Sequence, residues 1–158
     1  MGITENRRGP SGKTLPGLKM DLEEALRRLR EVFAGKGVVL AYLFGSYAEG
    51  AATAKSDLDI AVLVESGDLY ESYRELFLAV REALGTERFD LLLLNGASLP
   101  LKFEVVSRGR LIYCRDEDEL NEFEMDVIRK YQDTAYLRAV QDEYLRKRAK
   151  QWYSKGAA

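Results

Sequence analysis

Two short groups of residues in this chain could do chemistry together. Gly45 and Ser46 follow one apolar run, and ten residues later Asp57 and Asp59 open a second. Alternate side chains of a strand point to the same side, so this spacing places both carboxylates on one face. At about 5 Å and an effective dielectric near 20, the two charges would repel each other by about 3 kcal/mol. Something must compensate this repulsion, and Mg²⁺, which prefers oxygen ligands, does so naturally. An isolated Asp-x-Asp pair on a surface would instead be structural or solvated.

The Gly45-Ser46 pair has the properties of a phosphate-binding turn. Glycine lets a phosphate approach the backbone closely, and amides at a strand-to-helix turn, with the Ser46 hydroxyl, can donate hydrogen bonds to its oxygens. Ser46 and Glu49 also form the S-x-x-E pattern of a capping box, which would explain both residues without a ligand. The two interpretations are compatible, because a capped helix start is where an anion would sit. A phosphate cradle beside a metal-binding acid pair indicates metal-assisted chemistry on a nucleoside triphosphate.

The composition excludes several other kinds of chemistry and partner. The 158 residues include no His and one Cys, Cys114, which excludes a His-activated nucleophile, an internal disulfide and zinc sites built on His or on several Cys. The net charge of −2 does not predict a nucleic-acid-binding protein. No apolar run approaches the roughly 18 residues of a membrane span, and no signal-peptide pattern is present, so a cytoplasmic protein without a membrane partner is expected.

Predicted helices and strands position these residues. Apolar periodicity and turn residues predict, in chain order, a helix from Asp21 to the glycines at 35 and 37, strands at 38–44 and 57–64, a helix at 69–84, a strand at 89–94, a short helix at 98–106 and a short strand at 111–114. One or two charged helices follow from Asp116, with seven acids in 116–126 and five bases in 146–155. This order implies a small mixed-sheet α/β or α+β domain.

The chain divides into three expected regions. Residues 1–17 are polar and rich in Gly and Pro, which is typical of a flexible arm. Residues 18–115 form the domain that carries the candidate site. Residues 116–158 form a helical extension, expected to pack on the domain and to bind a partner. The bases near its end are explained by a solvated helix terminus that complements its own dipole, rather than by nucleic acid.

Taken together, the elements resemble a known family. Gly-Ser, ten residues and Asp-x-Asp, followed by an apolar strand, are similar to the nucleotidyltransferase superfamily that shares the palm of DNA polymerase β. More narrowly, Leu22 to Tyr153 resembles the minimal nucleotidyltransferases (MNT), the antitoxin partners of HEPN-domain toxins, through an Asp-Leu-x-x-Leu-Asn segment at 90–95 and a Gly-x-x-x-Tyr element at 109–113. The resemblance implies a polymerase β-like fold, with a small mixed sheet flanked by helices and a C-terminal helical tail.

The resemblance also implies roles for three acids. Asp57 and Asp59 would bind two Mg²⁺ ions, and Asp90, at the start of the third predicted strand, would complete the site. Asp90 would bind the catalytic metal and help to activate the attacking hydroxyl, while pyrophosphate leaves in line. Without the resemblance, Asp90 is simply an acid at the start of a strand.

The predicted nucleotide-binding residues beside these acids are Gly45, Ser46, Lys55 and Ser56. Many members of the family read Gly-Ser-Arg-Ala-Arg-Gly, whereas this chain has Tyr47 and Glu49 in place of the two arginines. The loop thereby loses two cationic contacts to a triphosphate and gains an acid. Lys55 could supply positive charge instead, and a solvated loop lysine is the alternative interpretation.

Three functions from different classes remain open. The resemblance favours a Mg²⁺-dependent antitoxin enzyme that transfers AMP from ATP to a hydroxyl, by analogy a tyrosine, of a cognate HEPN ribonuclease toxin and neutralises it in a hetero-oligomer. A second is a nucleotidyltransferase acting on a small molecule such as an aminoglycoside, against which the lack of an evident second substrate domain argues. A third is a non-catalytic antitoxin that acts by binding; the three acids argue against it and Glu49 argues for it.

Overall fold

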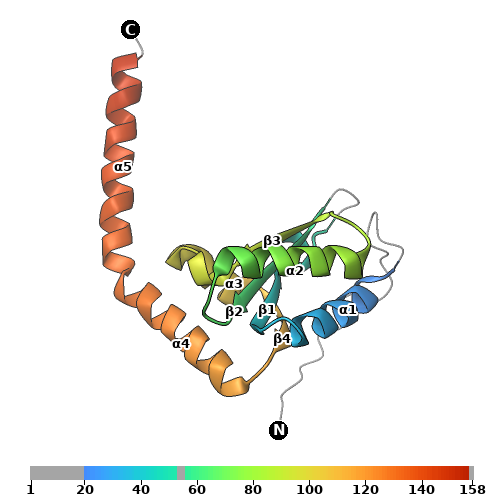
Figure 1. Ribbon diagram of the computed structural model, residues 1–158. Coiled ribbons are helices and arrows are strands. Elements are labelled where there is room, and N and C mark those ends of the chain that lie inside the picture. Colours follow the sequence, from blue (N-terminus) through green and yellow to red (C-terminus); the bar gives the residue numbers. More distant parts are fainter. Residues whose placement is uncertain (1–19, 53–55, 157–158) are drawn as a thin grey trace.

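The structure of the protein, a computed structural model, describes residues 20–52 and 56–156 (Figure 1). Its elements are α1 (Leu22–Ala34), β1 (Val38–Phe44), the 3-10 turn η1 (Gly45–Tyr47), β2 (Leu58–Val64), α2 (Leu69–Leu84), β3 (Phe89–Leu93), η2 (Leu94–Gly96), α3 (Leu99–Arg108), β4 (Arg110–Cys114), α4 (Glu117–Asp133) and α5 (Ala135–Gly156). The predicted α/β class, with a small mixed sheet, flanking helices and a helical tail, is confirmed. The proposed arm at 1–17 and Lys55 lie outside the described residues.

The four strands form one mixed sheet in the order β3-β2-β1-β4. β1 pairs antiparallel with both β2 and β4, whereas β2 and β3 are parallel and α2 makes the crossover between them. The register pairs Phe44 with Asp59 and Asp59 with Asp90. The end of β1 and the beginnings of β2 and β3 therefore meet at one end of the sheet.

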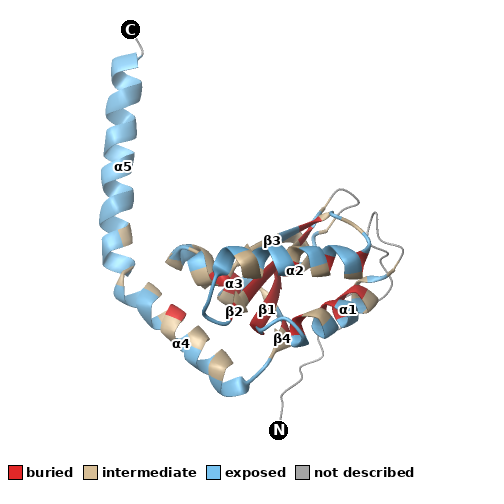
Figure 2. Ribbon diagram, in the orientation of Figure 1, coloured by how far each residue is buried: buried red, intermediate tan, exposed pale blue. Residues whose placement is uncertain are grey.

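Helices cover both faces of this sheet (Figures 1 and 2). Buried residues of α1 and α2, including Leu29 and Leu76, pack with Leu58 and Ile60 of β2 in a first core. Val105, the buried residue of α3, packs with partly buried residues of α4 and with the opposite side of β1 and β2 in a second core. Because each side of β2 faces a core, the strand reads as a continuous apolar run rather than a simple alternation.

Side-chain caps define where the helices begin. Asp21 Oδ1 accepts a hydrogen bond from the Glu24 amide at 2.8 Å, and Asp68 accepts from the first amides of α2. Ser98 and Asp116 cap α3 and α4 in the same way. Each cap satisfies amides that the helix itself leaves unpaired, so the predicted helix starts have a local physical cause.

The C-terminal segment separates into two helices with different surroundings. In α4, Val127 is buried and Glu124 Oε1 accepts a hydrogen bond from Tyr42 Oη at 2.7 Å. The ring of Tyr131 stacks on Phe103 of α3 with centroids 3.8 Å apart, and the Arg138 guanidinium lies over its other side, 3.5 Å from the ring centroid. Beyond this contact α5 projects away from the domain (Figure 1). None of the described helices is long and apolar enough to cross a membrane.

Candidate active site

Asp59 and Asp90 meet where β2 and β3 begin. The two residues are partners in the parallel register, so their side chains lie next to each other on the same face of the sheet. Burial raises the pKa of the Asp59 carboxyl, and the charge and hydrogen bonding of Asp90 raise it further, with an additional contribution from the charge of Asp57. Carboxyls held this close favour a shared proton or a cation between them.

Gly45 touches this acid pair from the end of β1. Its φ of 69° lies in the left-handed region, which glycine adopts without strain. A Cβ at this position would also overlap Asp59 Oδ2. Glycine is therefore required at position 45 for two reasons: the backbone conformation of the turn, and the space that the Asp59 carboxylate occupies.

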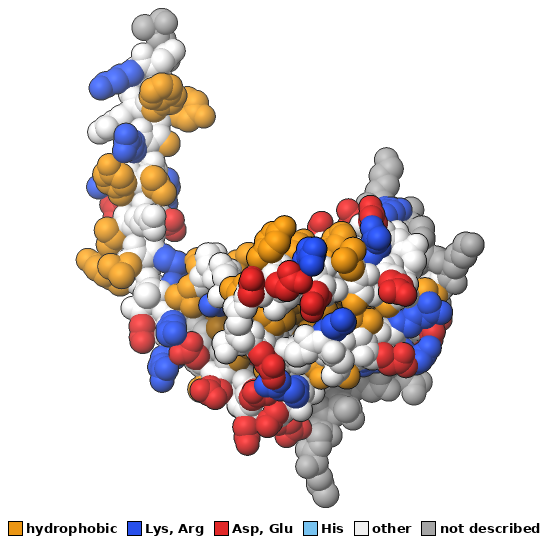
Figure 3. Space-filling view, in the orientation of Figure 1, with side chains coloured by type: hydrophobic (Ala, Val, Ile, Leu, Met, Phe, Trp, Pro, Cys, Tyr) orange, Lys and Arg blue, Asp and Glu red, His pale blue; other side chains and the backbone are white. Residues whose placement is uncertain are grey.

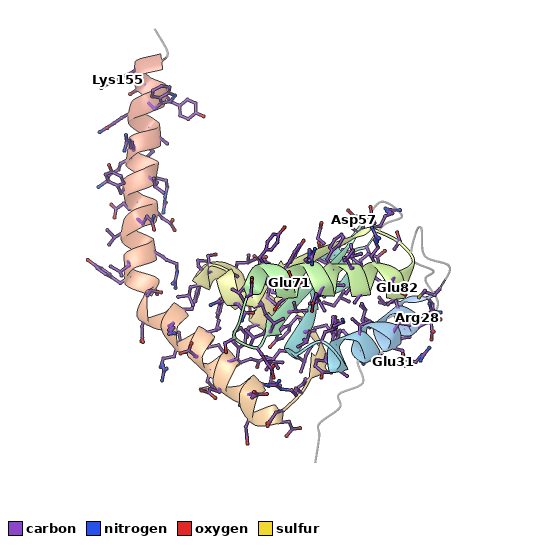
Figure 4. All side chains as sticks on the ribbon, viewed as in Figure 1. Arg28, Glu31, Asp57, Glu71, Glu82 and Lys155 are labelled. Atoms are coloured by element: carbon purple, nitrogen blue, oxygen red, sulfur yellow. The ribbon has the colours of Figure 1, made fainter. Side chains whose placement is uncertain are left out.

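Asp57 lies beside the pair and forms an ion pair with Arg88. Its Oδ1 lies 3.4 Å from Arg88 Nε, and half of the Asp57 side chain is exposed. Figure 4 shows Asp57 at the end of the sheet, far from Lys155 at the tip of α5. The structure thus brings Asp59 and Asp90 together and leaves Asp57 in an ion pair. Among the described residues, no group of three or more Asp, Glu or Cys side chains is placed to hold a metal ion without rearrangement.

Arg88 was not among the predicted site residues. The residue directly precedes β3, and the β2–β3 register pairs Leu58 with Phe89, so the residues before them, Asp57 and Arg88, become neighbours. A parallel register between strands separated by a helix is set by tertiary packing. The nearness of Arg88 to Asp90 in the sequence was a signal, but it did not identify Asp57 as the partner.

The loop after β1 differs from the predicted capping box. The turn η1 spans only three residues, and it has no side-chain hydrogen bond at its cap. The Glu49 amide donates to the Gly45 carbonyl at 3.2 Å, so backbone groups close the turn themselves. The S-x-x-E interpretation of Ser46 and Glu49 is therefore wrong. Tyr47 packs against the first core, and this burial raises the pKa of its hydroxyl.

A pocket of about 390 Å³ adjoins this loop, within the size range of small-molecule sites. Its lining residues are Phe44, Gly45, Ser46, Glu49, Ala51, Glu104 and Arg108. Glu104 and Arg108 come from α3 and were not predicted as site residues. Of the other predicted nucleotide-binding residues, Ser56 is half-buried directly before Asp57, and Lys55 is not described. Because Gly45 borders both the pocket and Asp59, a molecule in the pocket would lie beside the acid pair.

The sequence matches the family model described as "Polymerase beta, Nucleotidyltransferase" over residues 27–118, more than half of the chain. The chain belongs to this family. The match includes β1, the loop with Gly45, and the strands with Asp59 and Asp90, which are the parts that build the site.

Similar proteins narrow the assignment within the family. The protein adenylyltransferase MntA of Shewanella oneidensis is 37% identical over 95 residues, which cover 59% of this chain and 66% of that protein, just under two thirds of its length. A crystal structure of a toxin–antitoxin with AMP-PNP contains a chain with a TM-score of 0.63 and 29% identity, covering 76% of this chain and 98% of the other.

A second solved structure, the tri-AMPylated Shewanella oneidensis HEPN toxin in complex with MNT antitoxin, matches with a TM-score of 0.60 and 26% identity over 78% of this chain and 98% of the other. The predicted resemblance to polymerase β-like nucleotidyltransferases, and among them to MNT antitoxins, is confirmed by these matches.

Proposed function

We propose that this protein is an antitoxin that transfers AMP from ATP, with Mg²⁺, to a tyrosine hydroxyl of a cognate HEPN-domain toxin and thereby neutralises it. The observation that carries the proposal is the meeting of Asp59, Asp90 and Gly45 at one end of the sheet in a chain of the nucleotidyltransferase family. Similarity to a named protein adenylyltransferase and to a complex with an AMPylated HEPN toxin supports the acceptor class.

The donor set fits Mg²⁺. Asp57, Asp59 and Asp90 are carboxylates, the hard oxygen ligands that this ion prefers. Burial, and then the negative charge of Asp90, raise the pKa of Asp59, and a bound cation would offset that charge. Bound Mg²⁺ supplies charge stabilisation for the attacking and leaving oxygens of an in-line transfer. For Asp57 to serve as a ligand, its ion pair with Arg88 must open.

The chain's own residues complete the chemistry. Asp90 is exposed on the edge strand β3, so an acceptor hydroxyl on another protein can reach it and give up its proton there. Gly45 leaves the backbone of the turn open to phosphate, and Ser46 lines the same pocket. We infer that Gly45, Ser46 and Ser56 contact the nucleotide.

We further infer that residues 18–115 act as the nucleotidyltransferase domain and that the extension from residue 116 binds the toxin. α4 is packed against the domain, whereas α5 is exposed along its length with large apolar side chains that include Tyr144, Leu145 and Trp152. Large apolar side chains that their own chain leaves uncovered are typical of a surface that a partner covers.

A labelling experiment tests the proposed function. The protein is mixed with its cognate HEPN-domain toxin, Mg²⁺ and ATP labelled at the α-phosphate, and the modified residue is mapped by mass spectrometry. We expect label on a toxin tyrosine, dependence on Mg²⁺ and loss with Asp59→Asn. Glu82→Gln, which removes the charge of an exposed acid of α2 outside both the site and the extension, is the matched control and should retain activity.

The alternatives give different results in the same assay. Tight binding that neutralises the toxin without transfer of label would indicate a non-catalytic antitoxin, which the presence of Glu49 in the pocket favours. Label on an added aminoglycoside, but not on the toxin, would indicate a small-molecule enzyme. Either result contradicts the proposal.

A further inference from the structure

The loop side of the pocket beside Gly45 carries negative charge, which does not favour a triphosphate. The loop contributes Glu49, α3 contributes Glu104, and both are acids. Tyr47, at a position where the family resemblance leads one to expect arginine, is packed against the first core. A triphosphate in this pocket therefore needs positive charge from somewhere other than the described part of the loop.

Arg108 is the one base among the described residues that line this pocket. It is exposed in the last turn of α3, and within residues 20–52 and 56–156 its guanidinium has neither an ion-pair nor a hydrogen-bond partner. Arg88, the other arginine near the acids, differs because it pairs with Asp57. The Arg108 guanidinium is thus available to an anionic ligand without breaking an existing interaction.

The fold holds Arg108 in place beside the loop. Its neighbour Gly109 lies against β1, where a Cβ would overlap the Val105 carbonyl and lie 3.4 Å from the Leu43 carbonyl oxygen. Arg110 then pairs with Leu43 in the β1–β4 register. Because Gly45 follows β1 directly, the same contact that ends α3 sets Arg108 opposite the turn. The position of the Arg108 backbone beside the loop is therefore fixed by strand pairing.

We propose that Arg108 binds the triphosphate of the nucleotide and supplies from α3 the positive charge that the loop after β1 lacks. A guanidinium can donate two parallel hydrogen bonds to phosphate oxygens, a geometry that lysine does not offer. The assignment rests on the proposed function in one respect, that a nucleoside triphosphate is the substrate. It makes Arg108 a nucleotide-binding residue that no motif of the sequence identifies.

Calorimetric titration with AMP-PNP and Mg²⁺ tests the assignment. Loss of a hydrogen bond to a charged group predicts that Arg108→Gln weakens AMP-PNP binding about ten- to a hundredfold, with Arg108→Lys between it and the wild type. Adenosine binding should stay unchanged, because it carries no phosphate. Arg110→Gln is the matched control: it removes the same charge two residues away, where the side chain pairs with Glu23, and should change affinity by less than about twofold.

A purely structural role would give another pattern. A base in the last turn of α3 also complements the helix dipole, so thermal unfolding of each variant is measured alongside binding. Equal AMP-PNP affinity in Arg108→Gln and the wild type would overturn the proposal, as would equal losses for AMP-PNP and adenosine. A wild-type protein that binds no nucleotide would instead contradict the proposed function, and the role of Arg108 would fall with it.

Discussion

The sheet end that carries Asp59 and Asp90 and the helix α5 are built in opposite ways. The strands behind the acids are covered on both sides, and Ile60, next to Asp59, is fully buried. No described residue of α5 is buried, and its side chains include apolar groups along its length (Figures 2 and 3). Folding alone fixes the position of the acids, whereas the described part of the chain leaves α5 uncovered. Under the proposed function, chemistry and recognition are therefore separated along the chain.

Two leucine truncations of equal size test this contrast most strongly. Leu29 is fully buried under the sheet and Leu145 is 53% exposed on α5. Leu29→Ala should lower the free energy of unfolding by about 2–5 kcal/mol because it leaves a cavity. Leu145→Ala should change it by less than about 0.5 kcal/mol. Chemical denaturation of the isolated protein measures both. A large loss with Leu145→Ala would mean that α5 packs on the domain in solution.

A second substitution examines what covers α5. Trp152 and Tyr70 are almost equally exposed, at 77% and 76%, but Trp152 lies on α5 and Tyr70 on α2. If α5 binds the toxin, Trp152→Ala should weaken that complex about tenfold or more, since buried aromatic anchors dominate interfaces. Tyr70→Ala should leave the affinity nearly unchanged, and neither should alter thermal unfolding of the free protein. Equal effects on toxin affinity, measured by titration, would remove the distinction between the two surfaces.

The elements of the sheet could be predicted from the sequence because their apolar runs are short and bounded by glycines or caps. The meeting of Asp59 with Asp90 required the fold, since it depends on a parallel register across α2. The ion pair of Asp57 with Arg88 follows from the same register. A prediction from local spacing alone was wrong in the loop after β1. The capping-box spacing predicts a helix start there, but the chain makes only a three-residue turn.

Arg108 shows the same limit from the other direction. It lies more than 60 positions after Gly45 in the sequence, and its place beside the pocket depends on how α3 ends against β1. No spacing rule connects the two residues. The fold brings the predicted acids Asp59 and Asp90 to one end of the sheet, whereas the sequence-based prediction named neither Arg88 nor Arg108.

Two glycines after β1 distinguish the cost of backbone strain from the cost of contact with Asp59. Gly45 and Gly50 have nearly the same φ, 69° and 71°, but a Cβ would overlap Asp59 only at Gly45, while Gly50 has open space. Gly50→Ala should therefore lower the free energy of unfolding only by the cost of placing alanine in the left-handed region, about 1–2 kcal/mol. Gly45→Ala should lose more, because Asp59 must also move, and AMP transfer should fall with it. Equal losses of unfolding free energy would show that the overlap with Asp59 relaxes at no cost.

The smallest expected effect comes from an acid that lines the same pocket as Arg108. Glu49 is exposed in the proposed nucleotide pocket, so removing its charge with Glu49→Gln should tighten AMP-PNP binding only a few-fold and leave adenosine binding unchanged. The gain should shrink as salt rises, because exposed charges separated by more than about 8 Å are largely screened at physiological ionic strength. Calorimetry at low and high salt measures both. Glu31→Gln, an exposed acid of α1, is the control. A gain in affinity that does not change with salt would indicate that Glu49 contacts the ligand directly. That contact, rather than the balance of charge between the loop and α3, would then determine the change in AMP-PNP affinity.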